Sequence, residues 1–305
     1  MSKAFHRPPD GPAFNPFFAL VAGVLAVSTG AIFVRLAAGA PALVIAAYRV
    51  GLASAVIVPL AWFRARGELL ALSRRDLFLA GLSGFFLALH FATWISSLSF
   101  TSVANSVVLV NTNPLWVGLF TPLVTGERIR PAVAGGILLS VAGGVIIGFG
   151  DFATGGNALL GDLLALGGSV CAAVYLLLGR NLRRRLSLLA YICVCYTSAA
   201  AILWLLVLIL GLPVTGFSDS TYLSLWAMAL IPQLIGHSSY NWALKWFSTS
   251  FIAVSLLGEP VGSTLMAYFL FGEGLTAAKV GGGTLILTAI IWAAAGEDKK
   301  RPLPP

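Results

Sequence analysis

The chain has 305 residues, of which 58% are hydrophobic and only 10% are charged, and its formal net charge at pH 7 is +8. Its mean hydropathy of +0.93 lies well outside the range of soluble globular domains. The basic residues form no single clustered patch along the sequence, so the positive charge does not indicate nucleic-acid binding.

Ten apolar runs follow one another along the chain, each long enough to cross the core of a bilayer as a helix. The runs lack the alternating pattern of about ten residues that builds a membrane β-barrel. The sequence therefore predicts an all-α, polytopic membrane protein with ten transmembrane helices. The expected helices cover residues 15–35, 42–64, 76–97, 101–124, 130–149, 159–179, 187–210, 221–244, 247–271 and 276–295.

The basic residues in the connections fall mostly on one side of the expected helices. Of the 19 Lys and Arg residues, 16 lie in the N-terminus, in the C-terminal tail or in the connections that follow the second, fourth, sixth and eighth helices. The opposite side carries only Arg35 and Lys279, and Arg49 lies within a helix. By the positive-inside rule, the basic side faces the cytoplasm. We therefore expect a multi-pass protein of the cell (inner) membrane with both termini in the cytoplasm.

The two halves of the chain share features at a fixed offset of 146 residues. Pro114 and Pro260 are separated by this offset, and so are the pairs Gly126-Glu127 and Gly272-Glu273. Apolar composition alone would not align a polar Gly-Glu break, so we interpret the chain as a duplication. Five helices per repeat end on the side opposite their start, which predicts that the second repeat is inverted. The expected repeats cover residues 15–150 and 157–296.

These features together resemble a known transporter family. Each five-helix repeat ends its fourth helix in Gly-Glu, Glu259-Pro260 lies in the ninth helix, and Gly161-Asp162 opens the second repeat. The pattern, over roughly residues 15–295, resembles the drug/metabolite transporter superfamily, and specifically its ten-helix EamA branch. Within this branch the chain resembles the bacterial exporters of aromatic amino acids. The resemblance implies a secondary transporter whose substrate site lies at the membrane midplane between the repeats.

Polar side chains at helical spacing mark the surfaces that we expect to line the transport pathway, because polar groups cost much against lipid and little on a cavity wall. The third and eighth helices carry the clearest polar stripes. Trp94 and Tyr240 are 146 positions apart, so a twofold axis would set them on opposite walls of one cavity. The candidate substrate-binding residues are Ser28, His90, Trp94, Asn113, Trp116, Tyr175, Gln233, His237, Tyr240 and Asn241.

Each of these candidates has a purely structural alternative. His90 and His237 would also serve as hydrogen-bonding partners between helices, as would the serines and asparagines. Trp94 and Trp116 would also suit anchors at the level of the lipid headgroups. The three cysteines lie within expected helices, and two of them face different sides of one helix, so we expect no metal site and no cofactor.

Two ionisable residues lie inside the expected helices as candidates for coupling. Glu259 lies roughly 15 Å deep in the ninth helix, near the midplane. A charged carboxylate there costs several kcal/mol unless it is paired or hydrated, so Glu259 is a candidate proton carrier. Its alternative role is a cap on the helix break at Pro260. Arg49 lies roughly 10 Å below the outer face, where it could pair with Glu259, bind a substrate carboxylate or snorkel outward.

Aromatic rings beside one cation and one anion suit a zwitterion with an apolar side chain. We therefore predict a transporter, not an enzyme, that exports small metabolites of the neutral or aromatic amino-acid class by alternating access. A substrate gradient or a proton gradient would supply the energy for transport. The expected partners are the small-molecule substrate and the lipid bilayer. A nucleotide-sugar or phosphate antiporter would need several cations in its cavity. An integral membrane enzyme would need a nucleophile, an acid–base pair or a metal cluster, and the sequence presents none.

Overall fold

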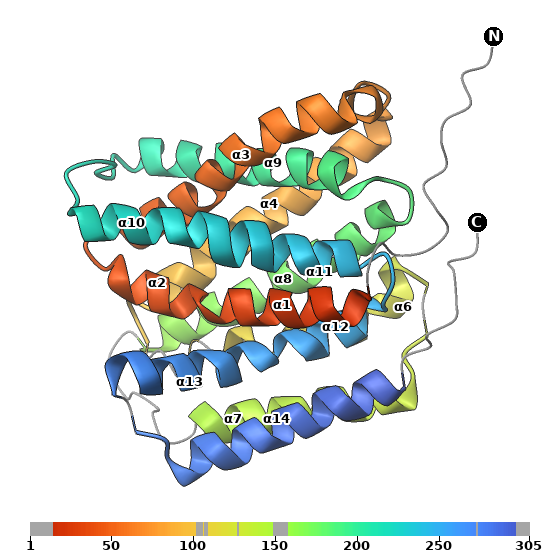
Figure 1. Cartoon of the computed structure of the whole chain (residues 1–305), viewed down its shortest axis with the longest axis vertical. Coiled ribbons are helices and arrows are strands. Elements are labelled where there is room, and N and C mark those ends of the chain that lie inside the picture. Colours follow the sequence, from red (N-terminus) through yellow and green to blue (C-terminus); the bar gives the residue numbers. More distant parts are fainter. Residues whose placement is uncertain are drawn as a thin grey trace.

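A computed structural model describes residues 15–101, 106, 109–126, 128–148, 158–272 and 274–296 of the chain. All regular elements in these ranges are helices, which confirms the predicted all-α class (Figure 1). In chain order the helices are α1 (Pro16–Ser28), α2 (Gly30–Leu36), α3 (Ala42–Leu70), α4 (Arg74–Ser97), α6 (Asn113–Val124), α7 (Pro131–Gly148), α8 (Ala158–Arg183), α9 (Leu188–Ile209), α10 (Asp219–Met228), the π-helix η2 (Ala229–His237), α11 (Ser238–Ala243), α12 (Thr249–Leu256), α13 (Gly258–Phe271) and α14 (Ala277–Ala295).

The helices match the expected membrane spans. Within the described residues, seven stretches are long and apolar enough to cross a membrane, and α7 adds a shorter apolar helix. The helix α6 and the continuous stretch α10–η2–α11 occupy the places of the expected fourth and eighth spans. Figure 1 shows that α1 begins and α14 ends at the same end of the bundle, as an even number of crossings requires. The chain is a multi-pass membrane protein.

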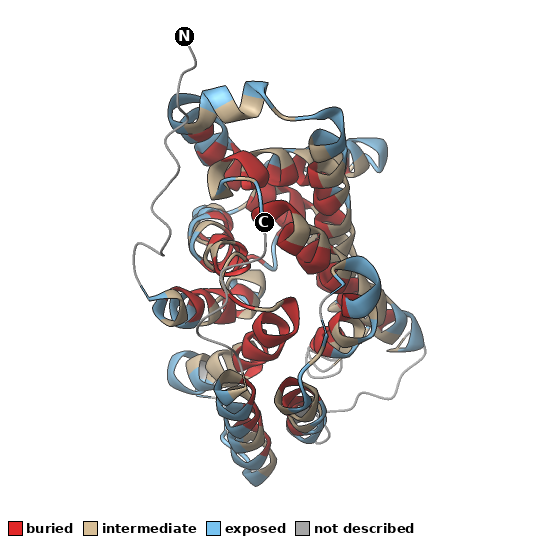
Figure 2. Cartoon of the chain, turned by 90° about the vertical axis from the view of Figure 1, so that its right-hand side faces the viewer, coloured by how far each residue is buried: buried red, intermediate tan, exposed pale blue. Residues whose placement is uncertain are grey.

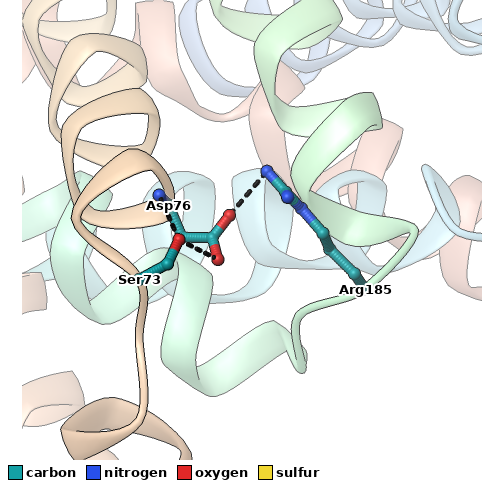
Figure 3. Close-up of polar contacts among 3 residues, drawn as sticks. All are labelled: Ser73, Asp76 and Arg185. Atoms are coloured by element: carbon teal, nitrogen blue, oxygen red, sulfur yellow. Dashed lines mark hydrogen bonds and ion pairs between the residues drawn. The ribbon is translucent and has the colours of Figure 1, made fainter.

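Six helices begin where the sequence supplies a side-chain cap. A serine, threonine or asparagine oxygen accepts a hydrogen bond from a backbone N–H of the first turn, which satisfies a donor that the helix leaves free. The capping residues are Asn15, Ser73, Ser187, Ser218, Ser248 and Thr276. At the start of α4 the cap joins an ion pair, in which Arg185 lies 2.5 Å from Asp76 (Figure 3). This pair ties α4 to the connection between α8 and α9.

Two membrane spans are interrupted beside a proline. α12 ends at Leu256 and α13 begins at Gly258, so Pro260 lies in the first turn of α13. Pro114 holds the equivalent place in the first turn of α6. Proline has no backbone N–H, and the first turn is where that donor has no partner inside the helix. The breaks expected from sequence are therefore present, and each starts a new half-helix inside the membrane span.

The same two half-helices also end alike. Gly126 follows α6 with φ of 69°, and Gly272 caps α13 with φ of 67°. This left-handed conformation is readily open to glycine because it has no Cβ. Two glycines 146 positions apart thus share one backbone conformation. The acidic partners of these glycines, Glu127 and Glu273, lie outside the described residues.

Two expected boundaries were wrong by several residues. α3 continues to Leu70, so the stretch from Arg64 to Glu68, expected as a connection, is mostly helical. α8 continues to Arg183, because its basic end is held inside the protein: Arg183 and Arg180 donate to backbone carbonyl groups near the end of α11. Arginine and glutamate favour helices, and a charge pattern marks only where a helix leaves the lipid.

Close approach between helices builds the bundle around α4. α4 packs against α8 and α9, α3 packs against α9, and α7 lies beside α14 (Figure 1). At Gly84 the crossing is so tight that an added Cβ would lie 2.3 Å from the carbonyl oxygen of Cys195. Small residues allow such contacts between membrane helices. Figure 2 shows the buried residues on the inward faces of the helices. Large apolar residues such as Phe63 are exposed at the surface, as lipid contact requires.

Candidate functional site

One cavity gathers residues from both halves of the chain. Its volume is about 50 Å³ for the centres of water-sized molecules, which is room for roughly four waters at 10–15 Å³ each. The helices α1, α3, α4, α6, α8, η2, α11, α12 and α13 all contribute to its walls. The lining residues are Val27, Arg49, His90, Phe91, Trp94, Val110, Asn111, Asn113, Ala172, Tyr175, Leu176, His237, Tyr240, Leu256 and Glu259.

The structure brings eight of the twelve predicted site residues to this cavity and leaves four outside its lining. Both predicted charges and most of the predicted rings line it. The eight are Arg49, His90, Trp94, Asn113, Tyr175, His237, Tyr240 and Glu259; the four are Ser28, Trp116, Gln233 and Asn241.

The four residues outside the lining make contacts behind the wall or beside it. Gln233 is fully buried and accepts a hydrogen bond from Arg49, while Asn241 donates to the hydroxyl group of Tyr175. Ser28 donates to the carbonyl oxygen of residue 24 in its own helix. Trp116 stacks on Phe120, with ring centroids 6.3 Å apart. Gln233 and Asn241 thus hold residues that do line the cavity.

Aromatic rings form most of the polar wall. His90 and Trp94 lie parallel, with ring centroids 6.0 Å apart and an angle of 6° between the planes. The ring centroid of His237 lies 5.2 Å from that of Phe91 and 4.7 Å from that of Tyr240. No ring contact joins Trp94 to Tyr240 in the part of the chain that the structure describes. The Nδ1 atom of His90 lies 2.9 Å from a backbone carbonyl oxygen, so this nitrogen carries the proton and donates.

Arg49 is the cation of the cavity, and its side chain turns inward. It is 2% exposed, which excludes the snorkelling orientation. Its Nε donates to Oε1 of Gln233 at 2.9 Å, and its guanidinium lies 4.1 Å from the ring centroid of Phe91. Within the described residues, no carboxylate lies at ion-pair distance from it and its Nη atoms have no hydrogen-bond partner. Four N–H groups of a buried cation are therefore free to bind water or a ligand.

Glu259 and Asn113 lie at the starts of two half-helices that both reach the cavity. Glu259 is in the first turn of α13, and Asn113 is the first residue of α6. The N-terminal end of a helix is positive, which stabilises a carboxylate there. Discontinuous helices that meet at a cavity are also the way in which many secondary transporters build a binding site.

Eight of the lining residues form four pairs at the offset of 146 positions. Equivalent positions of the two halves thus meet around one space, although the paired residue types differ. The pairs are Phe91 with His237, Trp94 with Tyr240, Val110 with Leu256, and Asn113 with Glu259.

Sequence reasoning missed seven lining residues, most of them apolar. A search for polar stripes cannot find apolar residues such as Val27 or Leu176, because apolar residues are equally common on the helix surfaces that face lipid. The repeat offset would have found one of them, because Phe91 is the equivalent of the predicted residue His237. Val110 is the equivalent of Leu256, and neither of these two was predicted. The other missed residues are Asn111, Ala172 and Leu256.

The chain is a bundle of membrane-spanning helices around a cavity, an architecture that membrane transporters of small molecules use. The model of the EamA-like transporter family matches residues 14–149 and again residues 159–295. The chain belongs to the EamA-like transporter family.

Similar proteins agree with this assignment. The chain is 22% identical over 246 residues to an uncharacterized transporter of Clostridium kluyveri, covering 77% of this chain and 78% of the relative. It is 27% identical over 201 residues to an uncharacterized transporter of Archaeoglobus fulgidus, covering 63% of this chain and 66% of the relative. A crystal structure of another protein shares the fold with a TM-score of 0.77 at 23% identity, over 92% of this chain and 97% of that one.

Proposed function

We propose that this transporter exports neutral or aromatic amino acids across the cell (inner) membrane, with both termini in the cytoplasm. Two inverted five-helix repeats, residues 15–150 and 157–296, alternate access to the central cavity. The observation that carries the proposal is the combination of aromatic rings, one arginine and one glutamate around one cavity.

The chemistry of the wall suits a zwitterion with an apolar side chain. The free N–H groups of Arg49 match a carboxylate, because a guanidinium can bind both oxygens of that group at once. The carboxylate of Glu259 matches an ammonium group, and the rings of Trp94 and Tyr240 offer stacking surfaces. Three further buried polar atoms have no partner among the described residues: Nε1 of Trp94, Oδ1 of Asn113 and Nδ1 of His237. Such atoms are expected where a ligand or water binds.

The size of the cavity supports alternating access. Space for roughly four waters does not admit a phenylalanine, so the walls must separate before a substrate enters. A substrate that binds the open and closed arrangements with different affinity would shift the balance between them. Glu259 is our candidate for a proton carrier in this cycle, since an acidic group inside a membrane span is costly unless it has such a role or a partner.

A nucleotide-sugar or phosphate antiporter is the second candidate, and the charge of the cavity argues against it. A phosphate group is usually bound by several cationic side chains. Arg49 is the one arginine or lysine that lines the cavity among the described residues, and Glu259 offsets its charge.

Counterflow in proteoliposomes tests the proposal. The purified protein would be reconstituted with unlabelled phenylalanine, leucine, threonine, glycine or a nucleotide sugar inside, and uptake of labelled phenylalanine would be followed. We expect internal phenylalanine and leucine to accelerate uptake most and the nucleotide sugar to have no effect. Acceleration by the nucleotide sugar alone, or by no amino acid, would overturn the proposal.

A further inference from the structure

The hydrogen bond between Arg49 and Gln233 joins a residue of the cavity wall to a residue behind it. Gln233 is 0% exposed and lies outside the lining, yet its Oε1 atom accepts the Nε–H of Arg49 at 2.9 Å. It lies beside Pro232 in the π-helix η2, which packs against α1 and α3. π-Helical turns are rare and are frequent at functional sites. The contact therefore joins an unusual backbone segment to the cation of the site.

The contact restricts how the guanidinium of Arg49 can bind an anion. A guanidinium can hold a carboxylate from its side, through Nε and one Nη atom, or from its end, through both Nη atoms. Gln233 occupies Nε, so only the end of the group remains available. The ring of Phe91, 4.1 Å from the guanidinium carbon, limits rotation of the plane. Together the two contacts fix the direction in which the remaining four N–H groups point.

The side-chain amide of Gln233 also carries an N–H donor group that makes no hydrogen bond among the described residues. Its Nε2 atom is buried and has no hydrogen-bond partner among the described residues. The side chain cannot be turned over, because Nε of Arg49 needs an acceptor and Nε2 is a donor. A buried unpaired donor costs free energy unless a ligand or water satisfies it. The amide keeps this orientation although it leaves a donor unpaired, so the contact fixes the Gln233 side chain together with that of Arg49.

The equivalent position in the first half shows that the scaffold alone does not require a glutamine there. The residue 146 positions before Gln233 is Leu87, which is apolar and fully buried in the regular helix α4. A polar residue at this position therefore occurs in the second half only, and the arginine that it contacts comes from the first half.

We propose that Gln233 is the positioning residue for substrate selection: it holds the guanidinium of Arg49 end-on to the cavity, so that the transporter selects molecules with a carboxylate over the corresponding amides and amines. This inference rests on the proposed function and names the group that Arg49 recognises. The role of Gln233 is indirect, since it acts through Arg49 and does not line the cavity.

The test compares L-phenylalanine with L-phenylalaninamide, which differ only in the carboxylate. KM and maximal rate would be measured by counterflow for the wild type, Gln233→Met and Gln233→Glu. Methionine keeps the length of the side chain and removes the acceptor. Glutamate keeps the acceptor, so this variant retains the contact with Arg49, but its charge competes with the substrate carboxylate. Leu87→Met is the matched control at the equivalent position.

We expect Gln233→Met to raise KM for phenylalanine roughly tenfold, which corresponds to about 1.4 kcal/mol. In Gln233→Met, the maximal rate and the KM for phenylalaninamide should change by less than about twofold. Gln233→Glu should lose the preference for the carboxylate completely. A purely structural role would raise both KM values alike, and that result would overturn the inference.

A further comparison separates this inference from the proposed function. If Arg49→Met removes the preference for phenylalanine over its amide while both Gln233 variants keep it, the proposed function stands and the role of Gln233 is refuted. If the wild type shows no preference between the two compounds, Arg49 does not bind the carboxylate, and both proposals fall.

Discussion

Replacing Trp94 by leucine tests whether the aromatic wall selects the substrate. Trp94 is 5% exposed, so truncation to alanine would leave a cavity that itself costs about 3–5 kcal/mol of stability. Leucine fills much of that volume but cannot stack. One face of the indole ring already lies parallel to His90, which leaves a single face for a substrate ring.

The expected loss follows from one stacking contact. An aromatic pair adds about 0.5–1.5 kcal/mol beyond the burial of area, so KM for phenylalanine should rise roughly two- to tenfold. Threonine cannot stack, and its KM should change by less than about twofold. Tyr240→Leu should give the same pattern, because Tyr240 holds the equivalent position and is likewise buried in the wall.

The assay is competitive counterflow with both amino acids on the same proteoliposomes. Trp204→Leu serves as the control, because the Trp204 ring packs on Tyr48 with centroids 5.2 Å apart and does not line the cavity. Equal increases in KM for phenylalanine and threonine would refute the reasoning. The rings would then hold the bundle together without reading the substrate.

Three further predictions concern coupling, packing and topology. Glu259→Gln should abolish the pH dependence of transport and leave the maximal rate of substrate exchange largely intact, although KM for phenylalanine should rise because its ammonium group loses a charged partner; unchanged pH dependence in well-folded protein would exclude a proton role. Gly84→Ala should destabilise the protein by about 1–3 kcal/mol in thermal unfolding, because the new Cβ would lie 2.3 Å from the Cys195 carbonyl oxygen. Gly81→Ala should be nearly neutral, because its new Cβ would lie 3.6 Å from Oγ of Ser198, an ordinary van der Waals distance. Reporter fusions after Ser218 should read periplasmic and fusions at the C-terminus cytoplasmic; a periplasmic C-terminus would exclude inverted repeats.

The fold could be predicted from sequence because the bilayer restricts the choices. Apolar runs of the right length must be helices, since every backbone polar group needs an internal partner. The breaks at Pro114 and Pro260 followed from the missing N–H of proline, and the helix ends at Gly126 and Gly272 followed from the Gly-Glu signal. Helix ends at charged segments were less predictable. Arg180 and Arg183 resemble loop residues by charge, and only the structure shows that they reach carbonyl groups inside the protein.

The site could be predicted only in part, because a polar stripe on a helix includes residues that do not line the cavity. Gln233 and Asn241 share a stripe with His237 and Tyr240, but their side chains bond to residues of the wall and do not line it. Periodicity reports that a polar residue turns away from lipid, and it does not distinguish a ligand contact from a support. Apolar lining residues such as Val27 give no signal of this kind, and Phe91 is found only through the repeat offset.

The two charges of the cavity break the equivalence of the two halves. Asn113 is the equivalent of Glu259, and Cys195 is the equivalent of Arg49, so each charged residue has a neutral counterpart. Arg49 belongs to the first half and Glu259 to the second, and the two form no ion pair with each other in the described structure. A zwitterion between them would therefore connect the halves, with its carboxylate on one and its ammonium group on the other.

Such a bridge predicts that the two residues are coupled only through the substrate. A double-mutant cycle of Arg49→Met and Glu259→Gln would measure this coupling from the affinity for phenylalanine and, separately, for phenylalaninamide. Groups that act independently add to within about 0.5 kcal/mol, whereas groups that share a ligand deviate by more. We expect coupling above about 1 kcal/mol for phenylalanine and none for the amide. Additive effects for phenylalanine would mean that Arg49 and Glu259 serve separate tasks, and a single zwitterion would no longer account for both charges.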